Sequence, residues 1–93
     1  MTYYELTFIF DSNEEMNTKG LELVEKEFLT HQAEVIKHDD MGVRSLAYPI
    51  KKQDKGHYHY YELTCDPLAV NVMSASFRLM QPIMKFLFVV KTK

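Results

Sequence analysis

The chain opens with a segment in which apolar and polar residues alternate, as they do along a strand with one buried face. Residues 3–10 (YYELTFIF) are also rich in aromatic and branched side chains, which favour strands. The polar run 11–13 that follows predicts a turn. The side chains expected on the buried face of this first strand are Tyr4, Leu6, Phe8 and Phe10.

A helix is predicted over residues 14–31, where apolar residues recur at spacings of three and four. Ser12 and Glu15 have the spacing of a capping box, in which each side chain binds an amide left unpaired at the helix start. Gly20 weakens the helix locally and leaves room for another element to pack closely. The apolar stripe of the helix consists of Leu21, Val24 and Phe28.

A long strand is predicted over residues 34–50. The stretch 39–42 inside it is expected to form a bulge or bend, because a glycine within a strand often marks one. Pro49 lacks an amide donor, which places this strand at a sheet edge. The polar, basic residues 51–56 predict a connecting loop, and residues 57–65 predict a third strand.

The last third of the chain predicts a helix and a strand. Asp66 is a preferred helix cap and Pro67 is preorganised for the first helical position. The helix is expected to continue to about Met80, with Pro82 ending it, and residues 83–91 form the last strand. The apolar stripe of this helix consists of Met73, Phe77 and Met80.

The resulting order is β-α-β-β-α-β, which is typical of a ferredoxin-like α+β domain spanning residues 1–93. Right-handed crossovers place both helices on one face of a four-stranded antiparallel sheet, with the first and third strands at its centre. Alternation along the third strand assigns Tyr61, Leu63 and Cys65 to the helix-covered core. The residues assigned to the open face are Tyr58, Tyr60, Glu62 and Thr64.

Composition and charge narrow the possible functions. The 93 residues carry a formal net charge of −2, but residues 1–40 hold ten acids and three bases, whereas residues 41–93 hold three acids and eight bases. This segregation is compatible with two solvated surfaces or with one basic face for a polyanion. The longest apolar run, 86–90, is far shorter than the ~20 residues that span a bilayer, and no secretion signal opens the chain.

The candidate chemistry of the sequence is sparse. His57 and His59 share one face of a strand, but a structural metal site takes four ligands, so the pair is interpreted as structural and no metal is expected. Cys65 is the only cysteine and is expected to be a small core residue. The chain contains no phosphate-binding glycine loop and no nucleophile elbow, so neither a cofactor nor a small-molecule substrate is expected.

The segment 42–52 (GVRSLAYPIKK) closely resembles the signature of the bacterial ribosomal protein S6 family, which reads G-x-R-x-L-A-Y-P-I-x-K. Gly56 and the aromatic run 58–61 stand where that family has a glycine and an aromatic strand. The segments containing Tyr4 and Val89 are similar to the family's first and last strands. The resemblance covers essentially all 93 residues.

This resemblance implies a non-enzymatic protein with the same ferredoxin-like fold. It implies binding to the central domain of small-subunit ribosomal RNA, on the platform, as a heterodimer with ribosomal protein S18. It also implies a cytoplasmic location within the ribosome. The alternative is a stand-alone protein-interaction module that binds no RNA, and a small-molecule or metal-binding regulator of the same fold is a further rival.

The resemblance also assigns roles to individual residues. Phosphate contacts are expected from a set of basic side chains, which would contribute affinity without reading sequence. They are Arg44, Lys51, Lys52, Lys55, Arg78, Lys85 and Lys91. Aromatic side chains are expected to face the protein partner or to stack on RNA, although packing between strands within the sheet would also explain them. They are Tyr48, Tyr58 and Tyr60.

Overall fold

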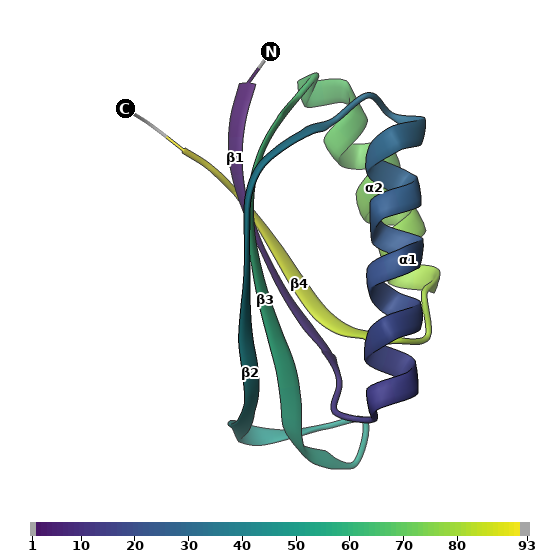
Figure 1. The fold of residues 1–93 in the computed structure, drawn as a ribbon, viewed down its shortest axis with the longest axis vertical. Coiled ribbons are helices and arrows are strands. Elements are labelled where there is room, and N and C mark those ends of the chain that lie inside the picture. The colour runs from purple at the N-terminus through teal and green to yellow at the C-terminus, as the bar shows by residue number, and fades with distance from the viewer. Residues whose placement is uncertain (1, 92–93) are drawn as a thin grey trace.

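The computed structural model describes residues 2–91, which form one four-stranded antiparallel sheet with two helices on a single face (Figure 1). The strand order β2-β3-β1-β4 confirms the predicted ferredoxin-like fold and its central pair of strands. Neither helix in this range is long and apolar enough to cross a membrane. The elements are β1 (Thr2–Asp11), α1 (Glu14–Thr30), β2 (Glu34–Ile50), β3 (Gln53–Cys65), α2 (Pro67–Leu79) and β4 (Ile83–Val90).

The core lies between the sheet and the two helices. Phe8 of β1 sits at its centre, with its ring centroid 5.1 Å from that of Phe77 on α2 and 5.8 Å from that of Tyr61 on β3. Edge-to-face geometry in both pairs adds to the stabilisation from burial. The predicted core faces of the first and third strands are confirmed, because Tyr4, Leu6, Phe8, Phe10, Tyr61, Leu63 and Cys65 are all buried.

The predicted cap is correct for α2 and wrong for α1. Asp66 caps α2 as predicted, and its side chain accepts a hydrogen bond from the Leu68 amide. The capping box predicted at Ser12 is wrong, because Asn13 is the cap of α1 and accepts from the Met16 amide at 3.1 Å. Asn13 has the extended backbone that a cap requires, whereas the Ser12 hydroxyl donates to Gln53 of β3.

Gly20 of α1 provides the close approach that its position predicts. A Cβ atom at this residue would lie 3.1 Å from Cβ of Pro82 and 3.2 Å from the ring of Phe10. The helix therefore packs directly against the start of β4 and the end of β1. The predicted helical stripes are also largely buried, since Val24, Phe28, Met73 and Phe77 are inaccessible and Leu21 and Met80 pack beside them.

The β2–β3 hairpin differs most from the prediction. The loop expected over 51–56 is wrong, because Lys51 and Lys52 alone form the turn and β3 begins at Gln53. Both lysines have a left-handed backbone, with φ of 49° and 64°. Two successive residues with positive φ are typical of the tightest hairpin turns, whose twist matches that of the strands. The bulge predicted over 39–42 is confirmed by a register shift before Gly42.

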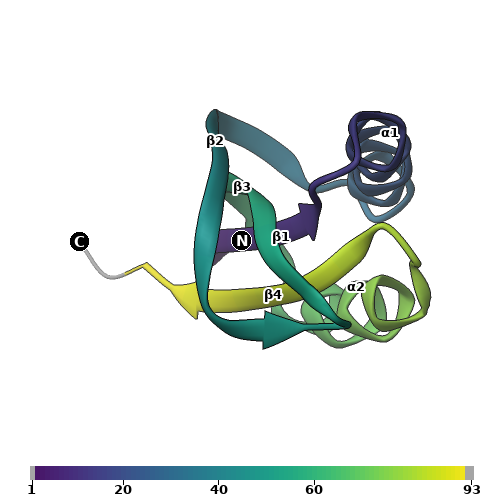
Figure 2. The ribbon, with the colours of Figure 1, turned by 90° about the horizontal axis from the view of Figure 1, so that it is seen from below.

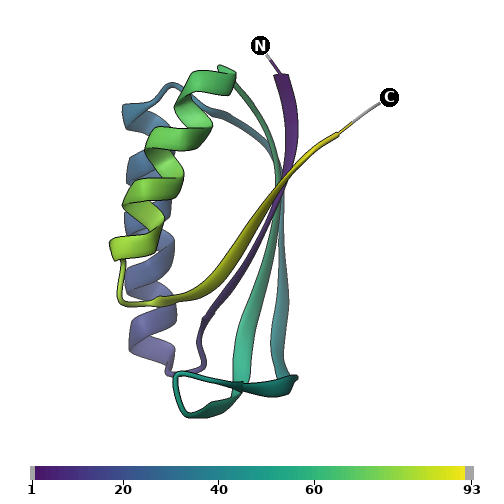
Figure 3. The ribbon, with the colours of Figure 1, turned by 180° about the vertical axis from the view of Figure 1, so that it is seen from behind.

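The second half of β2 curves across the hairpin end of the sheet. Figure 2 shows this segment passing beneath the sheet toward β4 and α2. Pairing with β3 is interrupted between Ser45 and Ile50, which allows the curve. The Lys51 ammonium donates to the carbonyl oxygen of Ile83 at 3.2 Å and thereby ties the turn to the start of β4. Seen from behind, the hairpin lies at the opposite end of the sheet from the two chain ends (Figure 3).

Candidate functional site

Basic side chains from three elements converge at the hairpin end of the sheet. Lys51 from the turn, Arg78 from the last turn of α2 and Lys85 from β4 line one pocket of about 330 Å³. The Arg78 guanidinium lies 5.9 Å from the centroid of the Phe86 ring, which also borders the pocket. A cation at the end of a helix is favoured by the helix dipole. This hairpin-end pocket thus joins three of the residues predicted to contact phosphate.

Two of the predicted tyrosines lie beside the hairpin-end pocket. Tyr48 is 59% exposed, and its hydroxyl is 3.2 Å from the Lys85 ammonium. A smaller pocket of about 140 Å³ is lined by both Tyr48 and Tyr58, with Lys85 between the two pockets. Tyr58 points to the open face of β3, as its place in the alternation predicted. The curve of β2 is what brings Tyr48 to β4.

The remaining basic residues of the hairpin are exposed along its two strands. Arg44 lies on β2 and its Nε donates to the carbonyl oxygen of Met41 at 3.2 Å. Lys55 on β3 is paired in register with Ser45, and Lys52 lies in the turn itself. The described chain therefore places six of the seven predicted basic residues on or beside one end of the sheet.

Lys91 and Tyr60 lie elsewhere, in a network around Glu62 on the open face. The Glu62 carboxylate accepts hydrogen bonds from Lys91 at 2.8 Å, from Tyr60 at 2.9 Å and from Tyr3 at 3.1 Å. These bonds, led by that from Lys91, lower the pKa of Glu62 to about 2. Burial and the bond to Glu62 raise the pKa of Tyr60 to about 12. Both predicted contact residues are thus engaged within the sheet.

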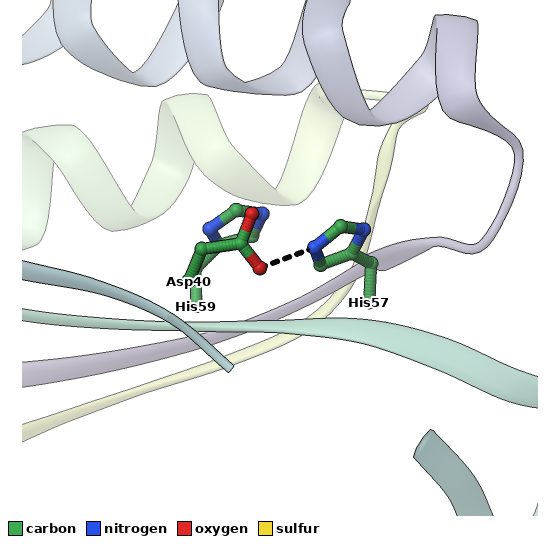
Figure 4. Close-up of side chains that lie close together, drawn as sticks. All are labelled: Asp40, His57 and His59. Carbon is green, nitrogen blue, oxygen red and sulfur yellow. Dashed lines mark hydrogen bonds and ion pairs between the residues drawn. The ribbon is translucent and has the colours of Figure 1, made fainter. Parts of the chain in front are cut away.

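A second polar cluster lies on the helix-covered side of the sheet. Figure 4 shows Asp40 of β2 gathered with His57 and His59 of β3, and the hydrogen bond between Asp40 and His57. His59 is fully buried, and its Nε2 lies 2.7 Å from Oδ1 of Asn17 on α1. Its Nδ1 lies 3.0 Å from Nε2 of His38. Burial lowers the pKa of His59 to about 4, so this imidazole is neutral at pH 7.

The sequence predicted that His57 and His59 share one face of a strand, and the structure places that face on the helix-covered side. The sequence did not predict that Asp40 and His38 lie beside them. Register pairs Asp40 with His59 across the two strands, and the bulge follows directly after Asp40. A bulge re-aims side chains on the bulged strand. The glycine at 42 was the available signal for this arrangement.

The comparison with known families decides what kind of protein this is. The family model described as "Ribosomal protein S6" matches residues 3–90, which take in both helices and the whole hairpin. The chain belongs to the ribosomal protein S6 family. This confirms the family inferred from the signature at 42–52, and S6 is a family of structural proteins of the small ribosomal subunit.

Individual S6 proteins resemble the chain along nearly its whole length. The small ribosomal subunit protein bS6 of Treponema pallidum (strain Nichols) is 33% identical over 89 residues, with 96% of both chains covered. The bS6 protein of Nitratiruptor sp. is 30% identical and covers 94% of this chain and 70% of its own length. The crystal structure of 30S ribosomal protein S6 from Thermotoga maritima superposes with a TM-score of 0.87 at 27% identity, covering 97% of this chain and 87% of that one.

Proposed function

We propose that this chain is a non-enzymatic constituent of the small ribosomal subunit, where it binds small-subunit ribosomal RNA together with ribosomal protein S18. Membership in the S6 family supports the ribosomal role. The convergence of Lys51, Arg78 and Lys85 on one pocket is the structural observation that supports RNA binding. The site of action is then the ribosome in the bacterial cytoplasm.

The RNA-facing surface is the hairpin end of the sheet. Lysine and arginine side chains from the turn, α2 and β4 offer several charges to neighbouring phosphates, which gives affinity that depends on salt. The acidic side chains of α1 line a separate pocket, and Glu14, Glu15 and Glu22 would repel a phosphate backbone there. This asymmetry orients the protein on RNA, although its net charge is negative.

The partner-facing surface is the open side of the sheet next to Tyr58. Leu87 of β4 is 60% exposed and Val89 is 46% exposed, and both lie on the side of the sheet away from the helices. An apolar pocket of about 200 Å³ lined by Ile9 and Leu87 continues this surface. Exposed apolar and tyrosine side chains are typical of protein interfaces.

Lys91 and Tyr60 contribute less to RNA binding than the sequence predicted. A phosphate contact by Lys91 would first have to break its 2.8 Å bond to Glu62. Tyr60 is held by the same carboxylate, so it cannot rotate freely toward a base. We therefore assign the RNA role to the hairpin end first, and we assign to the Glu62 network the role of holding the open face rigid for a partner.

Binding is docking between preformed surfaces, because the hydrogen bond from Lys51 to the Ile83 carbonyl ties the hairpin to the rest of the sheet. If S18 binds the open face, the hairpin end of this chain stays free to contact RNA while S18 contacts it too. A second contact made by an already docked protein has a lower ordering cost, so the two proteins should bind RNA cooperatively.

A binding titration over a series of salt concentrations tests this function. The full chain is titrated onto a platform fragment of small-subunit RNA, with and without S18. We expect tight binding only when S18 is present, with affinity that falls as salt rises. Absence of RNA binding in both arms, with both proteins folded, would contradict the proposal and favour a stand-alone protein-interaction module.

Charge reversal at the turn tests the surface assignment. Lys51→Glu with Lys52→Glu should weaken binding to the RNA complex and reduce the salt slope by about 2, if each lysine contacts one phosphate. Lys19→Glu with Lys26→Glu makes the same change of charge at exposed positions of α1 and serves as the control. Equal losses in the two double variants would contradict the assignment.

A further inference from the structure

The cluster of Asp40, His57 and His59 has the composition of a transition-metal site. One nitrogen or oxygen ligand atom from each residue lies within 4.8 Å of those of the other two. The residues come from adjacent strands and face the same side of the sheet (Figure 4). Imidazole nitrogen and carboxylate oxygen are ligands that zinc binds readily at about 2.0–2.2 Å.

His59 is oriented as metal-binding histidines usually are. Its Nε2 lies 2.7 Å from Oδ1 of Asn17, an oxygen that only accepts, so Nε2 carries the proton and donates it. The lone pair is therefore on Nδ1, which faces Nε2 of His38 at 3.0 Å. Metal-ligating histidines almost always donate their other ring N–H to an oxygen in this manner. Asn17 is itself buried, so the orientation of the ring is fixed by the fold.

His38 supplies a fourth nitrogen. Its Nε2 lies 3.0 Å from Nδ1 of His59, and a proton on His38 occupies the space between the two nitrogens. If His38 carried its proton on Nδ1 instead, both facing nitrogens would present lone pairs to a cation. This change of tautomer moves one proton within one ring and requires no other reactant.

We propose that Asp40, His57 and His59 bind one Zn²⁺ ion, with His38 as the fourth ligand. Three imidazole nitrogens and one carboxylate oxygen supply the four ligands that a tetrahedral zinc ion takes. Two ligands of one zinc ion lie at most about 4 Å apart. Some ligand atoms must therefore move closer together when zinc binds. Asp40 and His57 are the side chains that move, because they are 53% and 16% exposed, whereas His59 is buried and held rigidly.

The same two side chains give the ion a path from solvent. Oδ1 of Asp40 accepts from Nε2 of His57 and from the Gly42 amide, which leaves Oδ2 available to the metal. To bind zinc through Nε2, His57 gives up its hydrogen bond to Asp40 and carries its proton on Nδ1, so the proton stays within one ring. Bound zinc would connect the bulge of edge strand β2 to β3, and through Asn17 to the first half of α1. Bound zinc would therefore stabilise the edge of the sheet where strand pairing is irregular.

Isothermal titration of Zn²⁺ into the full, untagged chain after removal of metals by a chelator tests the site. We expect one saturable site per chain and a thermal unfolding midpoint that rises with zinc concentration. Mg²⁺ should not bind, because it prefers an octahedral shell of oxygen ligands. Absence of saturable zinc binding would overturn the proposal.

Variants of the partly exposed ligands keep the test independent of folding. His57→Gln and Asp40→Asn should each weaken zinc binding at least tenfold, and Asn17→Ala, which removes the partner that positions His59, should weaken it by about 10–100-fold. The matched control is His31→Gln, because His31 caps the end of α1 and pairs with Glu27, away from the cluster. This variant should bind zinc as tightly as the original chain does. Unchanged affinity in His57→Gln, or equal loss in His31→Gln, would overturn the site.

Imidazole nitrogen resonances provide a readout that does not depend on affinity. Zinc should shift the ring nitrogens of His57 and His59 and leave those of His31 unchanged. A shift confined to His31 would assign the bound ion to a surface pair and would overturn the proposal.

Discussion

The ammonium of Lys85 lies 3.2 Å from the hydroxyl of Tyr48 and 5.9 Å from the centroid of its ring. The two residues belong to β4 and β2, which occupy opposite edges of the sheet. Their contact therefore exists only because β2 curves beneath the sheet. It joins a residue proposed to contact phosphate with one proposed to contact a protein partner, so the two surfaces share one local structure.

The contact between Tyr48 and Lys85 should be measurable as a coupling energy. A cation over an aromatic ring at an exposed site contributes about 0.5–1 kcal/mol. A double-mutant cycle with Tyr48→Leu and Lys85→Met, followed by urea unfolding, should give a coupling of that size. Additive effects of the two substitutions would show that the curve of β2 is held by other contacts, such as that between Lys51 and Ile83.

Gly56 permits the close approach of β3 to β1 beside the hairpin. A Cβ atom at this position would lie 2.4 Å from Cγ2 of Ile9, whose branched side chain has little freedom to move away. Gly56→Ala should therefore destabilise the fold by about 1–3 kcal/mol, despite the better strand propensity of alanine. Chemical unfolding measures this loss. Ile9→Ala in the same chain should relieve part of it, and a fully additive double variant would contradict the steric explanation.

The fold could be predicted from the sequence because its information is local. Alternation in β1 and β3 and the helical spacing of Val24 and Phe28 agree with one another and with the order of elements. The two-residue turn could not be predicted, because lysines rarely adopt the left-handed backbone that Lys51 and Lys52 have, and the run KKQDKG has the composition of a loop.

The site is less local, and less of it could be predicted. The curve of β2 determines which basic residues converge. No residue in 44–50 predicts that curve. The neighbours of His59 depend on strand register, and the bulge after Asp40 shifts that register. Glu62 was placed on the open face, but its three donors come from Tyr3, Tyr60 and Lys91, which are scattered along the chain.

Glu62 should make stability depend on pH in a defined window. Its pKa is lowered from 4.5 to about 2 in the folded chain, first by the bond from Lys91. A carboxyl with a depressed pKa stabilises the fold above its unfolded pKa, and this stabilisation is lost as pH falls from about 4.5 toward 2. Urea unfolding at successive pH values should show a steeper loss for the original chain than for Glu62→Gln.

Glu22→Gln, at an exposed position of α1, controls for the loss of one carboxylate and should follow the original chain. Identical pH profiles for the original chain and Glu62→Gln would contradict the role of the network. If Glu62→Gln kept the pH profile of the original chain but bound S18 more weakly, Glu62 would contact the partner rather than stabilise the fold.

Replacement of Tyr61 by phenylalanine should stabilise the fold. Its hydroxyl is buried and has no hydrogen-bond partner among residues 2–91, while its ring stacks on His38 with centroids 4.2 Å apart. A buried hydroxyl without a partner loses its bonds to water on folding, so Tyr61→Phe should raise the free energy of unfolding by about 1–2 kcal/mol. Tyr3→Phe removes a hydroxyl that does have a partner, Glu62, and should lower it by about 1 kcal/mol. Urea unfolding of the two variants side by side measures both signs, and a loss of stability in Tyr61→Phe would show that the hydroxyl is satisfied in solution.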